Sequence, residues 1–118
     1  MKLKMLDILN STQFLSKLVE EELPGKTSLQ LMRNIKKINE EIAIFEEGNK
    51  KLMLKYGEKV KDKPDDYLEI PQEKKDVFLK EQNEMLQQEV EIDILLVDVE
   101  TLGKKSPKDL FSIDFMLE

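Results

Sequence analysis

Residues 28–57 read SLQLMRNIKKINEEIAIFEEGNKKLMLKYG. Within them, large side chains and one Asn recur at alternating spacings of four and three residues, which is the heptad pattern of a packed helix. We call these positions the seam: Leu31, Ile35, Ile38, Ile42, Phe45, Asn49, Leu52 and Tyr56. A helix of this length is about 43 Å long, whereas a compact globule of such a chain has a diameter of roughly 35 Å. We therefore expect a long helix in an elongated molecule.

A second helical pattern follows at residues 71–89, beginning with a proline, which suits the first position of a helix. The charged residues 58–69 between the two helices predict a loop, with a small strand at residues 67–70. When the two helices are aligned antiparallel about this loop, Gln82 lies beside Asn49. These two polar residues then share one layer, and such a layer sets the register of helices at some cost in stability.

The N-terminal part of the chain predicts two smaller elements. Residues 2–5 alternate between Lys and apolar residues, which indicates an edge strand or a frayed arm. Residues 10–12 are Asn, Ser and Thr, the types that cap helices, and the residues after them have helical spacing. We therefore expect a helix over residues 13–23, ended by Pro24.

The C-terminal part changes period. Residues 90–100 alternate, with one phase shift, and predict a strand with a bulge. Ser106 and Pro107 then form an N-cap and a first-position proline, which predict a short C-terminal helix. The expected fold is mainly α with a minor β element (α+β): a single domain over residues 1–118, built on a long antiparallel helical hairpin with short strands and a C-terminal helix.

Composition excludes several kinds of site. The chain has no Cys and no His, so thiolate or imidazole metal sites and Cys or His catalysis are absent. Asp98 and Glu100 share one face of the expected strand and could hold Mg²⁺, but alternation of this kind is typical of a solvated strand face. We therefore expect no enzyme, no metal and no cofactor.

Charge and hydropathy indicate the surroundings in which the chain works. The net charge of −6 has the wrong sign for a nucleic-acid-binding surface, and with no Trp there is little to stack on bases. No apolar run approaches the about 20 residues of a membrane span, and the start lacks the apolar core of a signal peptide. We expect a cytosolic protein that binds neither nucleic acid nor membrane.

Several short motifs resemble those of a family of small proteins encoded by tailed bacteriophages and prophages of Gram-positive bacteria. The motifs are Leu23-Pro24-Gly25-Lys26-Thr27-Ser28, Phe45-Glu46-Glu47-Gly48-Asn49-Lys50-Lys51-Leu52, Lys55-Tyr56-Gly57-Glu58, Ile70-Pro71-Gln72-Glu73-Lys74, Glu89-Val90-Glu91-Ile92-Asp93 and the closing residues 109–118. They are structural rather than chemical. The resemblance implies a protein-binding role in the host-cell cytoplasm, or association with the virion, and no catalytic residue of the family is established.

The leading hypothesis is therefore a non-enzymatic phage protein that acts through protein–protein binding. It would be a host-takeover or anti-defence factor, or an accessory of virion assembly. One alternative is an acidic mimic of nucleic acid that blocks the basic site of a host protein. Another, less favoured, is a carboxylate-metal hydrolase.

The seam has two interpretations, packing within the chain or contact with a partner. The helix over residues 71–89 is too short to cover the whole seam, so we expect uncovered apolar surface at its start. Burying that surface between two copies predicts a homo-oligomer, with a dimer favoured. The candidate partner-binding residues are Leu31, Ile35 and Ile38 on the seam, Glu89, Glu91 and Asp93 on an acidic edge, and Phe111, Phe115 and Leu117 near the C-terminus.

Overall fold

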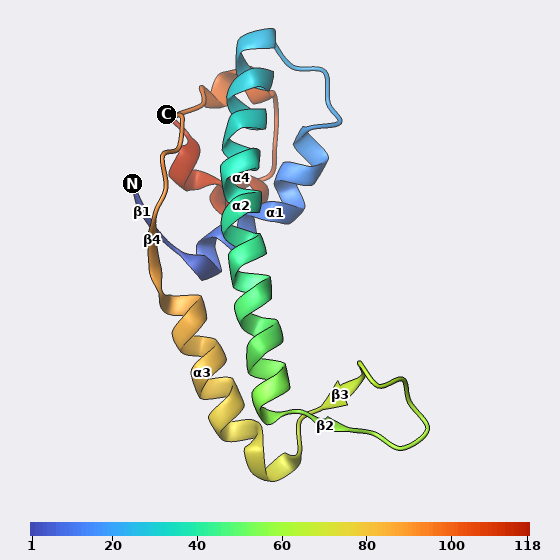
Figure 1. Ribbon diagram of the computed structural model, residues 1–118. Coiled ribbons are helices and arrows are strands. Elements are labelled where there is room, and N and C mark those ends of the chain that lie inside the picture. The colour runs from blue at the N-terminus through green and yellow to red at the C-terminus, as the bar shows by residue number, and fades with distance from the viewer.

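The computed structural model describes residues 1–118, and one long helix, α2 (Gly25–Tyr56), runs through most of its length (Figure 1). The molecule measures 52 × 29 × 24 Å, with a radius of gyration of 17.7 Å. A compact globule of this chain length would have a radius of gyration near about 13 Å. The elongated shape expected from the seam is confirmed, and so is the mainly α fold with minor β structure.

The lower half of the molecule is a helical hairpin, here called the stalk. Helix α3 (Lys75–Gln87) follows the 3-10 turn Gln72–Lys74 and packs antiparallel against the second half of α2 (Figure 1). Inside the stalk, Gln82 Nε2 donates to Asn49 Oδ1 at 3.0 Å, so the two polar residues share a layer as expected.

Between α2 and α3 the chain forms a projecting β-hairpin, the arm, in which two short strands flank a charged loop. Strand β2 (Glu58–Lys59) pairs antiparallel with β3 (Leu68–Glu69), which confirms a small strand there. Gly57 joins the arm to α2. A Cβ at Gly57 would overlap the carbonyl oxygen of Met53 and lie 2.9 Å from Leu68 Cβ, so only glycine fits between helix and arm.

The upper half, the head, contains the main hydrophobic core. Helix α1 (Met5–Leu18) packs against the first half of α2, and the C-terminal segments close over both helices (Figure 1). The core residues come from both ends of the chain and from α2: Leu3, Met5, Ile8, Phe14, Leu15, Leu18, Leu31, Ile38, Ile92, Val97, Leu102, Ile113 and Met116.

Helix α1 differs from the predicted helix over residues 13–23. Ser11 and Thr12 do not cap it but lie inside it, where their hydroxyls donate to the carbonyls of Ile8 at 2.6 Å and Leu9 at 2.8 Å. Hydroxyls satisfied by the preceding turn are compatible with a helix interior. The helix therefore begins at Met5 and ends at Leu18, before Pro24, which instead directly precedes α2.

The predicted strand over residues 90–100 is also wrong in extent. Strand β4 (Glu89–Glu91) pairs antiparallel with β1 (Lys2–Lys4) and then ends. Farther on, Val97 makes one parallel bridge to Leu117, and Val99–Leu102 is a 3-10 turn. Apolar and acidic residues do alternate over this segment, but after β4 its backbone packs along the head without forming a continuous strand.

The C-terminal helix begins as predicted. Helix α4 (Pro107–Ser112) has Pro107 at its first position, and the Ser106 hydroxyl accepts a hydrogen bond from the Asp109 amide at 3.2 Å. A 3-10 turn, Asp114–Met116, follows it and places Met116 in the core of the head.

Candidate protein-binding surfaces

The acidic residues of the chain do not converge. No three carboxylates lie close enough together to hold a metal ion. Asp98 and Glu100 do not share a strand face, because Asp98 is the cap of the 3-10 turn and its Oδ1 accepts from the Glu100 amide at 3.1 Å. In the structure, Asp98 stabilises the start of this 3-10 turn.

The shifted pKa values of the stalk belong to an ion pair. Lys55 Nζ donates to Glu81 Oε1 at 3.1 Å and lies 5.0 Å from the centre of the Tyr56 ring. The hydrogen bond from Lys55 is the main cause that lowers the pKa of Glu81, with the adjacent Tyr56 side chain as a further cause, and the same bond to Glu81 raises the pKa of Lys55. Both groups are stabilised in their charged forms, which favours the closed hairpin.

The start of the seam is covered by the chain itself. Leu31 and Ile38 are each only 1% exposed, because α1 and the C-terminal segments pack over them. These two side chains thus have no free surface for a partner, so the expectation of uncovered apolar surface at these two positions was wrong. Ile35 is half-buried, packs at the edge of the same core and keeps one side open. The homo-oligomer stays a prediction, without the support of Leu31 and Ile38.

An open apolar groove lies between the end of α1 and the first half of α2. We call it the α1–α2 groove, and its volume is about 790 Å³. Val19 is 50% exposed and Met32 is 61% exposed, although both are apolar. The groove is lined by Leu18, Val19, Glu21, Leu23, Ser28, Leu31, Met32, Ile35, Lys36, Asn39, Glu40 and Ala43. Two of the predicted partner-binding residues on the seam, Leu31 and Ile35, line the groove. Ile35 is partly exposed there, whereas Leu31 is buried.

A second cavity, of about 490 Å³, lies between α1 and α4. Phe111 on α4 borders it with its side chain 81% exposed, and the half-buried Phe115 lies beside it. Leu117, the third C-terminal candidate, is half-buried against the core and does not line this cavity. The structure thus brings Phe111 and Phe115 together and separates them from the seam residues.

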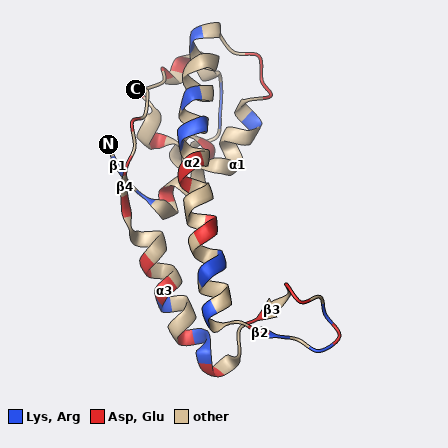
Figure 2. Cartoon of the chain, in the orientation of Figure 1, with Lys and Arg blue, Asp and Glu red and all other residues tan.

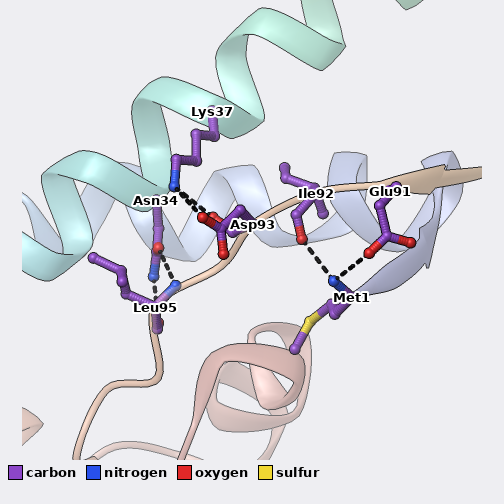
Figure 3. A network of polar contacts seen from close by, with 7 residues as sticks. All are labelled: Met1, Asn34, Lys37, Glu91, Ile92, Asp93 and Leu95. Atoms are coloured by element: carbon purple, nitrogen blue, oxygen red, sulfur yellow. Dashed lines mark hydrogen bonds and ion pairs between the residues drawn. The ribbon is translucent and has the colours of Figure 1, made fainter.

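The acidic edge is exposed but already has partners within the chain (Figure 3). Glu91 Oε1 accepts from the α-amino group of Met1 at 2.9 Å. The Asp93 carboxylate lies 3.5 Å from Lys37 Nζ, and Lys37 also donates to the Asp93 carbonyl at 2.7 Å. Glu89 is exposed and forms no ion pair. This edge therefore fastens β4 and the following residues to the head.

One structural residue was missed by the sequence analysis. Asn34, fully buried on α2, pairs with the main chain of Leu95 (Figure 3). Its position between the seam residues Leu31 and Ile35 is the signal that was available. A polar residue next to the apolar stripe of a helix requires a hydrogen-bond partner.

The charges of the molecule are mixed rather than segregated. Figure 2 shows acidic and basic residues interspersed along α2, α3 and the arm. None of the helices has the length and the apolar composition required to cross a membrane. No family model matches the chain, and no curated protein and no solved structure matches it.

Proposed function

We propose that the chain is a non-enzymatic phage protein that acts by binding another protein, in the host cytoplasm or in the virion. It would serve as a host-takeover or anti-defence factor, or as an accessory of virion assembly. The observation that carries the proposal is the α1–α2 groove, where Val19 and Met32 remain exposed beside a complete core. Exposed apolar surface in a recess is typical of protein-binding sites.

The dimensions of the groove fit a helix. The residues of α2 that line it extend from Ser28 to Ala43, which corresponds to about 22 Å along the helix axis, or about four turns. The end of α1 forms the opposite wall. An amphipathic helix that lays its apolar face between two helices is a recurring mode of peptide recognition. The occupant proposed here is therefore a helical segment of the partner, about four turns long.

The charge around the groove gives this helix an orientation. The turn after α1 carries Glu20, Glu21 and Glu22 and reaches the α1 end of the groove through Glu21, the one of the three that lines it. Glu21 pairs with Lys105 at 2.7 Å, whereas Glu20 and Glu22 form no ion pair. Partner residues that reach this end would be basic, since unpaired carboxylates attract positive charge. The mimicry of nucleic acid has less support, because it requires acidic residues gathered on one face and Figure 2 shows both signs intermixed.

Capture from infected cells, compared between matched variants, tests this function. Met32→Asp and Val19→Asp place a charge in the groove at exposed positions, so the fold is expected to remain intact. Leu79→Asp is the control, since Leu79 is similarly exposed, at 56%, on the stalk. A partner captured by the wild type and by the control but reduced at least about tenfold by both groove variants supports the proposal. Equal capture by all four proteins contradicts it.

Light scattering coupled to gel filtration tests whether the occupant is a second copy. A dimeric mass that becomes monomeric in Met32→Asp, but not in Leu79→Asp, would assign the groove to self-association. A monomeric mass across a tenfold range of concentration would contradict the predicted homo-oligomer and leave the groove to a different protein.

A further inference from the structure

The cavity between α1 and α4 combines an exposed aromatic ring with carboxylates. Its lining comes from β1 and α1 on one side, and from α4 and the following 3-10 turn on the other. The residues are Leu3, Asp7, Asn10, Lys108, Phe111, Ser112, Asp114 and Phe115. We call this cavity the α1–α4 notch.

The ring of Phe111 is the most exposed of the large apolar side chains in the molecule, at 81%. Its neighbour Phe115 is half-buried and packs against the core, and Ile113 between them is fully buried. The segment is therefore anchored from below while Phe111 extends outward. Exposed aromatic residues such as Phe are enriched in protein interfaces relative to the rest of the surface.

The carboxylates of the notch have no cationic partner. Asp7 from α1 and Asp114 from the 3-10 turn line the same cavity, and neither forms an ion pair within the chain. Lys108 also lines the notch and forms no ion pair, so the lining carries one negative charge in excess. The notch thus presents an aromatic face together with unneutralised acceptors.

We propose that the α1–α4 notch binds an arginine side chain of a partner protein. A guanidinium group is planar, stacks on an aromatic ring and donates several hydrogen bonds to carboxylates, so it satisfies both features of the notch. A lysine ammonium offers only a point charge and stacks less well. This inference rests on the proposed function, since the arginine belongs to a bound protein, but it concerns a surface separate from the α1–α2 groove.

Nuclear magnetic resonance with a small probe tests the inference without knowledge of the partner. The probe is the blocked tripeptide acetyl-Ala-Arg-Ala-amide, titrated into the ¹⁵N-labelled full chain. Saturable shifts of the amide signals of Asp7, Asn10, Phe111 and Asp114 are expected. The same peptide with citrulline in place of arginine is the control, because it keeps the shape and loses the charge, and it should cause no saturable shift.

Two variants assign the binding to the ring and to the carboxylates. Phe111→Ala should weaken binding of the arginine peptide about fivefold, since it removes the stacking surface. Asp114→Asn should weaken it comparably, and a thermal melt of each variant checks that the fold is unchanged. The inference is overturned if citrulline shifts the same signals, if the shifts occur elsewhere, or if both variants bind as the wild type does.

The outcomes separate this inference from the proposed function. Loss of partner capture in the α1–α2 groove variants, without any response to the arginine peptide, would refute the notch and keep the function. A specific arginine response, with partner capture unaffected by the groove variants, would keep the notch and refute the groove.

Discussion

The side chain of Asn34 takes the place of a neighbouring strand for Leu95. Asn34 Nδ2 donates to the Leu95 carbonyl at 2.8 Å, and the Leu95 amide donates to Asn34 Oδ1 at 2.8 Å. Both main-chain groups of Leu95 are thereby satisfied by a helix rather than by a sheet. The extended segment after β4 needs no further strand to hold it against the head.

Replacing Asn34 with Ala should destabilise the head strongly. The substitution leaves the amide and the carbonyl of Leu95 without partners next to the core, and each buried polar group left unpaired costs about 1–3 kcal/mol. We expect a loss of about 2 kcal/mol in the free energy of unfolding, measured by urea denaturation. Asn39→Ala, at an exposed position on the same helix, should change it by less than about 0.5 kcal/mol. Equal effects of the two substitutions would show that the pairing is dispensable.

The layer of Asn49 and Gln82 should behave as a coupled pair. Asn49→Leu alone removes the acceptor of Gln82 Nε2 in a half-buried site, so a loss of about 1 kcal/mol is expected. Replacing both residues with Leu should recover that loss, because no polar group is then left unpaired. A double-mutant cycle of unfolding free energies measures the coupling. Additive effects of the two changes would contradict a role in setting the register.

The ion pair between Lys55 and Glu81 makes the stability of the stalk dependent on pH. Lys55 holds the pKa of Glu81 below its ordinary value of 4.5, so this stabilisation is complete above pH 4.5 and is lost as the pH falls through the lowered value. Glu81→Gln should therefore lower the melting temperature at pH 7, and the difference from the wild type should shrink at pH 3. Glu84→Gln, at an exposed residue without an ion pair, serves as control. A difference that is constant with pH would exclude the linkage.

Two glycines of α2 and its end should respond in opposite ways to alanine. A Cβ at Gly57 would meet the carbonyl of Met53 and the side chain of Leu68, so Gly57→Ala should cost about 1–3 kcal/mol by displacing the arm. Nothing lies within 4 Å of a Cβ at Gly25, and Gly25→Ala should stabilise the protein by about 0.5 kcal/mol. Thermal unfolding of the two variants distinguishes them. Similar melting temperatures would mean that the arm moves freely relative to α2.

The sequence predicted the elements whose determining residues lie within a few positions of one another. The seam of α2 is a pattern that repeats along one helix, about every turn. The cap of α4 involves Ser106 and Asp109, which are three residues apart. The alignment of Asn49 with Gln82 also followed, because consecutive antiparallel helices can be aligned about the centre of the segment that connects them.

Elements that depend on distant contacts were predicted less well. Alternation over residues 90–100 is the same whether the partner of the backbone is a strand or the side chain of Asn34, 61 positions away from Leu95. Ser11 resembles a cap, yet it is fully buried because α1 lies under the C-terminal segments. The groove was missed for a related reason. Met32 is off the seam, and only the placement of α1 turns it into the wall of a recess.

The pairing of β1 with β4 has a consequence for the order of folding. Leu3 pairs with Val90, and the Thr27 hydroxyl donates to the Thr101 hydroxyl, so the head joins segments that are far apart along the chain. The stalk joins neighbouring segments only. Closing a long loop costs more entropy than closing a short one, and contacts between neighbouring segments form sooner. On a ribosome, α1 can therefore pack on α2, and α3 on α2, before the C-terminal segments emerge. Until then, the face of α1 that packs against those last segments of the head stays in contact with water.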